Sequence, residues 1–387
     1  MKMSKKLKIA YLSYYDSDVI RYWSGSVYFM RKSLEQANTE VVPVHNLGSK
    51  IDDFYKIKSL YYKIIGKQYH RPREISINKR AAQIAEKKIK QLKPDVILSS
   101  GALEIAQIDT NIPLTFWSDA TFNNIVNYYP DYSNLAPETF RNGEYLEKMS
   151  LGKANLQFFS SDWASNDSIN HYKSDPTKVK SIPFGANILE LPNYNTIKER
   201  IANKKFDTIN FLFVGVDWIR KGGDIALKIV EKLRQNGINA KLQVVGCTPN
   251  LENKPDFVEI YGYLVKANQD DYTTLVRLYE EAHFFMMPSR YESFGIAVCE
   301  ANANGLPVIG AKTGGLQHIV KENINGFVFD YKYSESEINR LTEQIISLIS
   351  DREKLLELGL SSYNEYSTNL NWDVSGKKIV DLLMNIA

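Results

Sequence analysis

The chain has 387 residues, and its 44% hydrophobic and 24% charged residues are typical of a packed globular protein. This composition excludes a disordered, collagen-like or fibrous chain, and at roughly 150 residues per domain the length predicts two domains or a little more. The formal net charge is +3, and the two cysteines, Cys247 and Cys299, exclude a disulfide framework and favour a reduced, cytoplasmic setting.

Apolar runs along the chain are short. The basic N-terminus leads into an apolar run from Ile9 to Leu12, which is too short for a signal peptide. Other runs, such as Phe211 to Val216, fall far below the roughly 20 residues needed to cross a bilayer. We therefore expect a chain that is neither secreted nor inserted in a membrane.

Short runs rich in β-forming residues alternate with longer helical patterns, which predicts an α/β protein with parallel sheets. The strands predicted in the first half are Lys8–Tyr14, Glu40–His45, Asp95–Ser99, Leu114–Trp117 and Leu156–Ser160. Those predicted in the second half are Ile209–Val214, Lys241–Val245, His283–Met287, Pro307–Gly310 and Gly326–Phe329.

The polar segment from 188 to 208 contains Pro192 and has no strong core pattern, which predicts a boundary between two similar α/β units. We assign residues 1–190 to an N-terminal domain and 205–370 to a C-terminal domain. Residues 371–387 contain a last helix that begins at Trp372, and its apolar stripe needs a partner surface.

Basic residues gather between Lys50 and Lys93, where 13 Lys/Arg face 4 Asp/Glu. The local net charge is +9, so the rest of the chain carries −6. Four tyrosines lie within this segment. One interpretation is a solvated, charged helical face. The other is a peripheral contact with an anionic membrane, at the inner face of the plasma membrane. Nucleic-acid binding is not expected, because no recognised module accompanies the charge.

Two features of the first half are compatible with ligand binding. Gly25 lies between the first strand and a helix predicted over Val27–Leu34, where a glycine lets a ligand approach the backbone closely. Asp119 follows the strand Leu114–Trp117, and its carboxylate either orients a hydroxyl group or caps the next turn.

A stronger pattern follows the first strand of the second half. Gly215 permits a sharp turn, and Arg220 and Lys221 precede a helix that we expect to be capped by Asp224 and to span Ile225–Leu233. Two cations together with free helix amides suit a diphosphate. The alternative is a surface Lys-Arg pair before a helix.

The strongest pattern runs from Pro288 to Ala301, after the strand that ends at Met287. A helix is predicted to begin near Phe294 or Gly295 and to end at Gly305. Its first amides attract an anion, and the strand ends of both patterns meet at one edge of an open α/β sheet, where ligands bind.

Two carboxylates, Glu292 and Glu300, belong to this pattern. Carboxylates accept hydrogen bonds from hydroxyl groups, so phosphate on the amides and hydroxyls on the glutamates describe a nucleotide sugar. The alternative is a solvated glutamate at each position. A glycosidase pair is disfavoured, because eight helical residues at roughly 1.5 Å each separate them by about 12 Å, beyond the roughly 5–9.5 Å of such pairs.

On these residues the chain resembles a GT-B glycosyltransferase of family 4, a retaining group that uses nucleotide sugars. The E-x7-E pattern from Glu292 to Glu300 matches the family hallmark, and Lys221-Gly222 matches its phosphate-binding lysine. The resemblance implies two Rossmann-like domains facing across a cleft. The N-terminal domain would bind the acceptor and the C-terminal domain the nucleotide sugar, and the helix that begins at Trp372 would cross back onto the N-terminal domain.

The resemblance also implies a role for each site residue. Lys221 would neutralise the diphosphate. Glu292, with the amides of Phe294 and Gly295, would hold the hydroxyls of the donor sugar. Glu300 would hold the ribose hydroxyls.

Two glycines complete the implied donor site, since Gly25 would approach the diphosphate from the N-terminal side and Gly215 would line it. The chain departs from the family at three places, one of which is His318, where a glutamate is frequent. Val216 stands where an arginine is frequent, so Arg220 is the candidate replacement. Ser118 stands where a histidine is frequent, so Asp119 is taken as the candidate residue for orienting hydroxyls.

The implied reaction moves a sugar from a nucleoside diphosphate to an acceptor hydroxyl in bacterial polysaccharide or glycolipid assembly, with retention. The acceptor is a glycan or a lipid-linked molecule. UDP is favoured as the nucleotide only because it is common. No cofactor, divalent metal or metal ligand is expected. The alternatives are another GT-B enzyme of the epimerase type and a non-catalytic sugar-binding protein.

Overall fold

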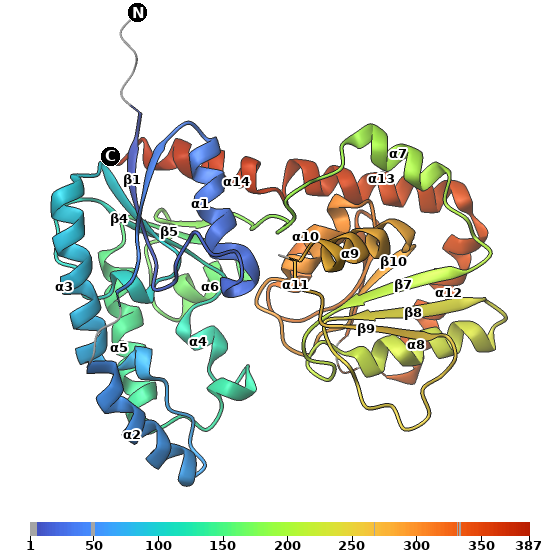
Figure 1. Cartoon of the computed structure of the whole chain (residues 1–387), viewed down its shortest axis with the longest axis horizontal. Helices are drawn as coiled ribbons and strands as arrows, with labels where there is room; N and C mark the ends of the chain where they lie inside the picture. The colour runs from blue at the N-terminus through green and yellow to red at the C-terminus, as the bar shows by residue number, and fades with distance from the viewer. Residues whose placement is uncertain (1–5, 48–50, 267, 331, 333) are drawn as a thin grey trace, which may run out of the picture. The chain divides into compact units, whose positions relative to one another are not determined.

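The computed structural model describes residues 6–47, 51–266, 268–330, 332 and 334–387, and of residues 51–54 only the backbone. The chain forms two compact units (Figure 1). Unit 1 comprises Met1–Phe184 with Trp372–Ala387, and unit 2 comprises Gly185–Asn371.

Unit 1 is built on a six-stranded parallel sheet in the order β2-β1-β3-β4-β5-β6. Buried aliphatic and aromatic residues from the strands, such as Leu12, Ile97 and Phe116, form its core. The strands are β1 (Lys8–Leu12), β2 (Glu40–Val44), β3 (Val96–Ser99), β4 (Leu114–Ser118), β5 (Leu156–Phe159) and β6 (Val179–Ser181). The helices are α1 (Ser26–Gln36), α2 (Ile51–Ile64), α3 (Ile75–Leu92), α4 (Phe122–Ile125), α5 (Pro137–Lys153), α6 (Asp162–Asn170) and α14 (Trp372–Leu383), with 3-10 turns η1 (Tyr22–Gly25), η2 (Arg71–Arg73), η3 (Leu103–Ile105) and η4 (Pro130–Tyr132).

The last helix, α14, completes unit 1 by packing on α1. Trp372 stacks on Phe184 at 5.4 Å between ring centroids and meets Trp117 edge-on at 5.3 Å. Gly376 allows the close approach, because a Cβ there would lie 2.6 Å from the carbonyl oxygen of Ser33. The apolar stripe of the C-terminal helix thus finds its partner surface in unit 1 (Figure 1).

Unit 2 contains a second six-stranded parallel sheet in the order β12-β11-β10-β7-β8-β9. This is the Rossmann order, in which the direction of winding reverses between the first and fourth strands, here β7 and β10. The strands are β7 (Ile209–Val214), β8 (Ala240–Val245), β9 (Val258–Gly262), β10 (Phe284–Met287), β11 (Val308–Ala311) and β12 (Gly326–Phe329). The helices are α7 (Tyr194–Ala202), α8 (Gly223–Gln235), α9 (Gln269–Glu281), α10 (Ile296–Ala303), α11 (Leu316–Ile319), α12 (Glu335–Ser350) and α13 (Arg352–Thr368).

The predicted α/β class with two Rossmann-like domains is confirmed by these two sheets. The observed division after Phe184 lies earlier than the boundary predicted at 188–208. That segment contains α7, whose Ile197 is fully buried and whose Ile201 packs toward Gly305 and Gly359 of unit 2. The sequence did not reveal the short buried face of α7, because most residues of the segment 188–208 are polar.

Among the described residues, the structure has no helix with the length and apolar character needed to span a membrane.

Candidate functional site

Two loops leave adjacent strands at the carboxyl edge of the unit 2 sheet. β7 and β10 pair in parallel, with Phe211 opposite Phe284 and Phe213 opposite Met286. The loops 215–222 and 288–295 follow these strands. Since the sheet reverses its winding between β7 and β10, this is the point where open α/β sheets bind ligands.

The two loops are joined through their backbones. The amide of Arg290 donates to the carbonyl of Arg220 at 2.8 Å. Gly222 has φ +75, and a Cβ there would lie 1.9 Å from the carbonyl oxygen of Pro288. Only a glycine fits this contact, so the identity of residue 222 fixes the distance between the loops.

Lys221 and Glu292 meet where the loops join. The Lys221 ammonium donates to the Glu292 carboxylate, and a guanidinium nitrogen of Arg220 lies 3.9 Å from the same carboxylate. The side chains of Lys221 and Glu292 are 13% and 11% exposed. Two cations therefore approach the Glu292 carboxylate, and a second carboxylate, that of Asp217, lies near Lys221 and accepts from the Arg220 amide at 2.9 Å.

Burial is the main influence on Lys221. It lowers the pKa of the ammonium, and the nearby Arg220 lowers it further, whereas Glu292 raises it. Gly215 makes room for this lysine, because a Cβ on Gly215 would lie 2.8 Å from Lys221 Cγ. Gly215 thus acts on the site by allowing Lys221 to fold back over the end of β7.

The start of α8 differs from the prediction. Asp224 was expected as the N-cap, but the cap is Gly222 and Asp224 lies in the first turn. The Asp224 carboxylate accepts two hydrogen bonds from Arg290, at 2.8 and 2.7 Å. The prediction was wrong because the left-handed glycine begins the helix earlier, and Asp224 instead ties α8 to the second loop.

The second loop enters α10 through Phe294 and Gly295. Phe294 is buried, and Gly295 has φ +104 and forms the N-cap of α10. α10 ends at Ala303, and Gly305 follows with φ +68, so the predicted start and end of this helix are confirmed.

Glu300 lies on α10 and is held by two side chains. Tyr279 Oη donates to its carboxylate at 3.0 Å, and the Lys266 ammonium also donates to it. Lys266 Nζ in turn donates to the carbonyl of Asn187 at 3.0 Å. Burial, followed by the charge of Glu300, raises the pKa of Tyr279 well above its usual range, so this hydroxyl stays a donor.

Sequence reasoning missed Tyr279 and Lys266. Tyr279 is buried on α9, where an aromatic residue is indistinguishable from core by its spacing. Lys266 follows β9. Because this strand was not predicted, the sequence did not indicate that Lys266 lies at the carboxyl edge of the sheet.

The other two predicted site residues belong to unit 1. Gly25 has φ +98 and caps α1, and it follows Trp23 and Ser24 with φ +49 and +55. Three successive left-handed residues are a costly conformation of the kind found at ligand sites. Asp119 follows β4 and is partly exposed, and Thr121 caps the next helix.

Unit 1 also has a polar cluster at its own reversal point, between β1 and β3. Ser100 Oγ donates to Ser13 Oγ at 3.0 Å and lies 3.3 Å from the Glu104 carboxylate. Burial raises the pKa of Glu104 to about 7. The sequence offered no motif for this cluster, because its members come from two segments that are far apart in the chain.

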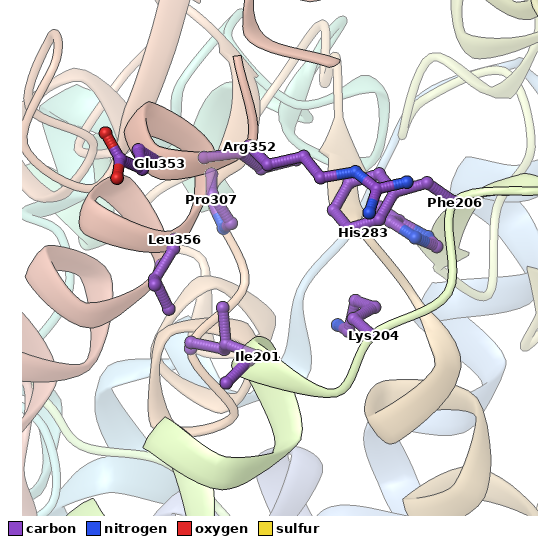
Figure 2. Close-up of a pocket in the computed structure, with 12 residues that line it drawn as sticks. Ile201, Lys204, Phe206, His283, Pro307, Arg352, Glu353 and Leu356 are labelled. Atoms are coloured by element: carbon purple, nitrogen blue, oxygen red, sulfur yellow. The ribbon is translucent and has the colours of Figure 1, made fainter. Parts of the chain in front are cut away.

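A cavity of about 150 Å³ lies at the opposite edge of the unit 2 sheet, where β10 begins (Figure 2). His283 lines it, with Nδ1 accepting from the Asn210 amide at 3.1 Å and Nε2 bonded to the Lys205 carbonyl at 2.8 Å. Burial, reinforced by Lys204, lowers the pKa of His283 to about 4. Both ring nitrogens of this neutral histidine are hydrogen-bonded, so it connects the start of β10 to β7 and to the segment that follows α7, and its role is structural.

Metal ligands are not clustered in the part of the chain that the structure describes, where no three His, Cys, Asp or Glu residues are placed to hold an ion.

Residues 195–364 match the family model described as "Glycosyl transferases group 1". An uncharacterized glycosyltransferase of Methanocaldococcus jannaschii is 29% identical over 223 residues, which are 54% of this chain and 55% of the relative. Across three curated relatives the match spans only 55 to 64% of the relative's length.

Solved structures are similar over almost the whole chain. Sucrose-phosphate synthase from Thermosynechococcus elongatus superposes with a TM-score of 0.66 at 17% identity and covers 98% of this chain and 99% of its own. Anabaena HepE, in complex with UDP and glucose, gives a TM-score of 0.59 at 16% identity, covering 98% and 99%. The fold of two Rossmann-like domains is shared with these proteins.

Proposed function

We propose that the chain is a retaining glycosyltransferase that moves a sugar from a nucleoside diphosphate to an acceptor hydroxyl. The observation that carries the proposal is the contact of buried Lys221 with Glu292, beside Arg220, at the reversal point of the unit 2 sheet. The group 1 family match over 195–364 supports the same reaction class.

Lys221 and Arg220 would stabilise the diphosphate. Negative charge grows on it as the bond to the sugar breaks, and preorganised cations at that point lower the barrier. An ammonium has three donors, so Lys221 can keep Glu292 while donating to a phosphate oxygen. The backbone amides of Phe294 and Gly295, at the start of α10, would add neutral donors.

Glu292 and Glu300 would bind hydroxyl groups. A carboxylate offers about four acceptor positions, which is the chemistry that binding several hydroxyl groups requires. Glu292 lies beside the cations and would hold the sugar hydroxyls. Glu300 would hold the ribose hydroxyls from its position between Tyr279 and Lys266.

Arg220 would replace the arginine that the resemblance implies at the position of Val216. Val216 is 64% exposed and brings no charge. Arg220 reaches the site instead, since its guanidinium donates to the Tyr291 carbonyl at 3.3 Å and approaches Glu292.

Unit 1 would supply the acceptor side. The left-handed turn at Gly25 would let the donor diphosphate approach the backbone, and Asp119 would orient a hydroxyl. We propose a glycan or lipid-linked acceptor and a UDP-sugar donor, since Anabaena HepE has been solved in complex with UDP-glucose. We also propose a cytoplasmic setting for a reaction without divalent metal. The acceptor oxygen would bond to the anomeric carbon on the side that the diphosphate leaves, and its proton would pass to the departing phosphate oxygen.

The test is release of nucleoside diphosphate from UDP-, GDP- and ADP-sugars, with the anomeric configuration of the product read by NMR. Lys221→Ala and Glu292→Gln should each lower transfer by about 10²–10³. Lys241→Ala is the matched control, because it removes a lysine–glutamate pair that lies on the exposed surface, 41% and 34% accessible. Near-normal transfer by both site variants contradicts these roles. Donor binding without turnover favours a sugar-binding protein, and isomerised donor favours an epimerase.

A further inference from the structure

Helix α2 in unit 1 turns its apolar side outward. Ile57, Leu60, Tyr61 and Ile64 are 73%, 59%, 57% and 76% exposed, and Ile65 directly after the helix is also exposed. Their spacing of three and four residues places them on one stripe of the helix. A surface helix of a globular protein normally buries such a stripe against the core.

The polar side of α2 faces the rest of unit 1. Tyr55 Oη shares a hydrogen bond of 2.7 Å with Ser76 Oγ. Lys58 pairs with Glu74 at 2.7 Å and with Glu138 at 2.6 Å. The helix is thus anchored by hydrogen bonds and ion pairs through its polar face, and its aliphatic stripe is exposed. α2 lies at one end of unit 1 (Figure 1).

Positive charge borders the stripe. Lys56 and Lys63, which flank it on α2, are exposed. Elsewhere in the same basic segment, α3 carries the exposed residues Lys79, Arg80, Lys87 and Lys90. Lys50, at the start of the basic segment, lies outside the described residues. The aliphatic side chains and the tyrosine suit the acyl-chain region of a bilayer, and the lysines beside them suit the anionic headgroups above it.

We propose that α2 docks on an anionic lipid bilayer, with Ile57, Leu60, Tyr61 and Ile64 entering the boundary between headgroups and acyl chains. The charge argues against a second copy of the chain as the occupant. A face-to-face pair would bring the lysines of two identical helices together, and their like charges would repel. This surface lies outside the donor site, and it goes beyond the proposed function by assigning the place where a lipid-linked acceptor is met.

Flotation of the full chain with vesicles tests the proposal. We expect binding to vesicles of phosphatidylcholine with 30% phosphatidylglycerol, little binding to phosphatidylcholine alone, and weaker binding as salt rises. The variant I57S/L60S/I64S should lose binding at least tenfold. K56Q and K63Q should each lose about fivefold at low salt.

The matched control is L189S/I324S/M384S, which changes three exposed apolar residues that do not belong to α2 and should bind as the unchanged chain does. Both triple variants should keep their far-UV circular dichroism and their release of nucleoside diphosphate with a water-soluble acceptor. This second readout separates failure of the docking surface from failure of the proposed reaction. Absence of binding to anionic vesicles at low salt overturns the proposal. Undiminished binding by I57S/L60S/I64S also overturns it. A third contrary result is that the unchanged chain forms a dimer and I57S/L60S/I64S is a monomer.

Discussion

At Glu300 a single carboxylate joins three segments of unit 2. α10 carries it, α9 brings the Tyr279 hydroxyl, and the loop after β9 brings Lys266. A carboxylate that must accept ribose hydroxyls needs a fixed orientation, and groups that fix a binding residue act on affinity through it. Tyr279 and Lys266 are therefore positioning residues for the proposed donor site.

Tyr279→Phe should weaken donor binding with a smaller effect on kcat. The change removes a buried hydrogen bond to a charged group, which is worth roughly 1.5–3 kcal/mol, so the donor Kd should rise by about tenfold or more. Isothermal titration calorimetry with the donor measures it. The matched control is Tyr261→Phe, which removes a similar bond of 2.9 Å to Glu259 outside the site. An unchanged Kd in Tyr279→Phe would show that Glu300 does not depend on this hydroxyl.

Glu104 should make unit 1 less stable as pH rises. Its pKa is about 7 in the folded chain and roughly 4.3 when unfolded. Between these values the folded state holds a proton that the unfolded state has lost, so stability present below about pH 4 is progressively lost toward pH 7 and above, by on the order of 1–3 kcal/mol. Urea unfolding at pH 5 and pH 8 should show a smaller difference for Glu104→Gln than for the unchanged chain; an equal difference would contradict the assignment.

At the scale of elements, the two glycine-containing loops of the donor site are built around one backbone contact. Gly222→Ala should both destabilise unit 2 and reduce transfer, because the new Cβ would collide with the Pro288 carbonyl at 1.9 Å in addition to adopting a left-handed φ. Gly237→Ala separates the two effects, since Gly237 has φ +81 but nothing within 4 Å of its Cβ. Gly237→Ala should lower the free energy of unfolding by roughly 1–2 kcal/mol and leave sugar transfer unchanged. Thermal unfolding measures the stability of Gly222→Ala and Gly237→Ala, and nucleoside diphosphate release measures their transfer. An equal loss of transfer in both variants would exclude a role for the distance between the loops.

Of the twelve strands in the described part of the chain, ten could be predicted, because buried parallel strands are continuous apolar runs. The two that were missed have weaker patterns. β6 (Val179–Ser181) is only three residues long and carries a lysine, and in β9 (Val258–Gly262) only Val258 is fully buried. Both are edge strands of their sheets, which have one strand neighbour and need less apolar sequence.

The candidate site was predictable to the extent that its residues share loops. Lys221, Arg220 and Glu292 follow neighbouring strands, and the structure brings them together. Lys266 and Tyr279 could not be found in this way, because their approach to Glu300 depends on the packing of α9 and on a missed strand. The left-handed φ of Gly222, which displaced Asp224 from the cap, is likewise set by contact with Pro288 in a distant loop.

At the scale of the molecule, unit 1 depends on a helix from the far end of the chain. Trp372→Ala should remove a buried indole that contacts Phe184 and Trp117, at a cost of about 3–5 kcal/mol. Hydrogen exchange should show lost protection in α1 and β4 but not in β7 or β10. Met384→Ala is the control, because Met384 is exposed at the end of α14. Loss of protection spread evenly over both sheets would contradict separate units.

This dependence also bears on the order in which the chain is made. A ribosome releases the six strands of unit 1 first, yet the tryptophan that covers Phe184 emerges only after all of unit 2 has been synthesised. The domain that is translated first is therefore finished last. During that interval α1, Trp117 and Phe184 expose apolar surface that α14 later covers, and such surface promotes aggregation of the nascent chain.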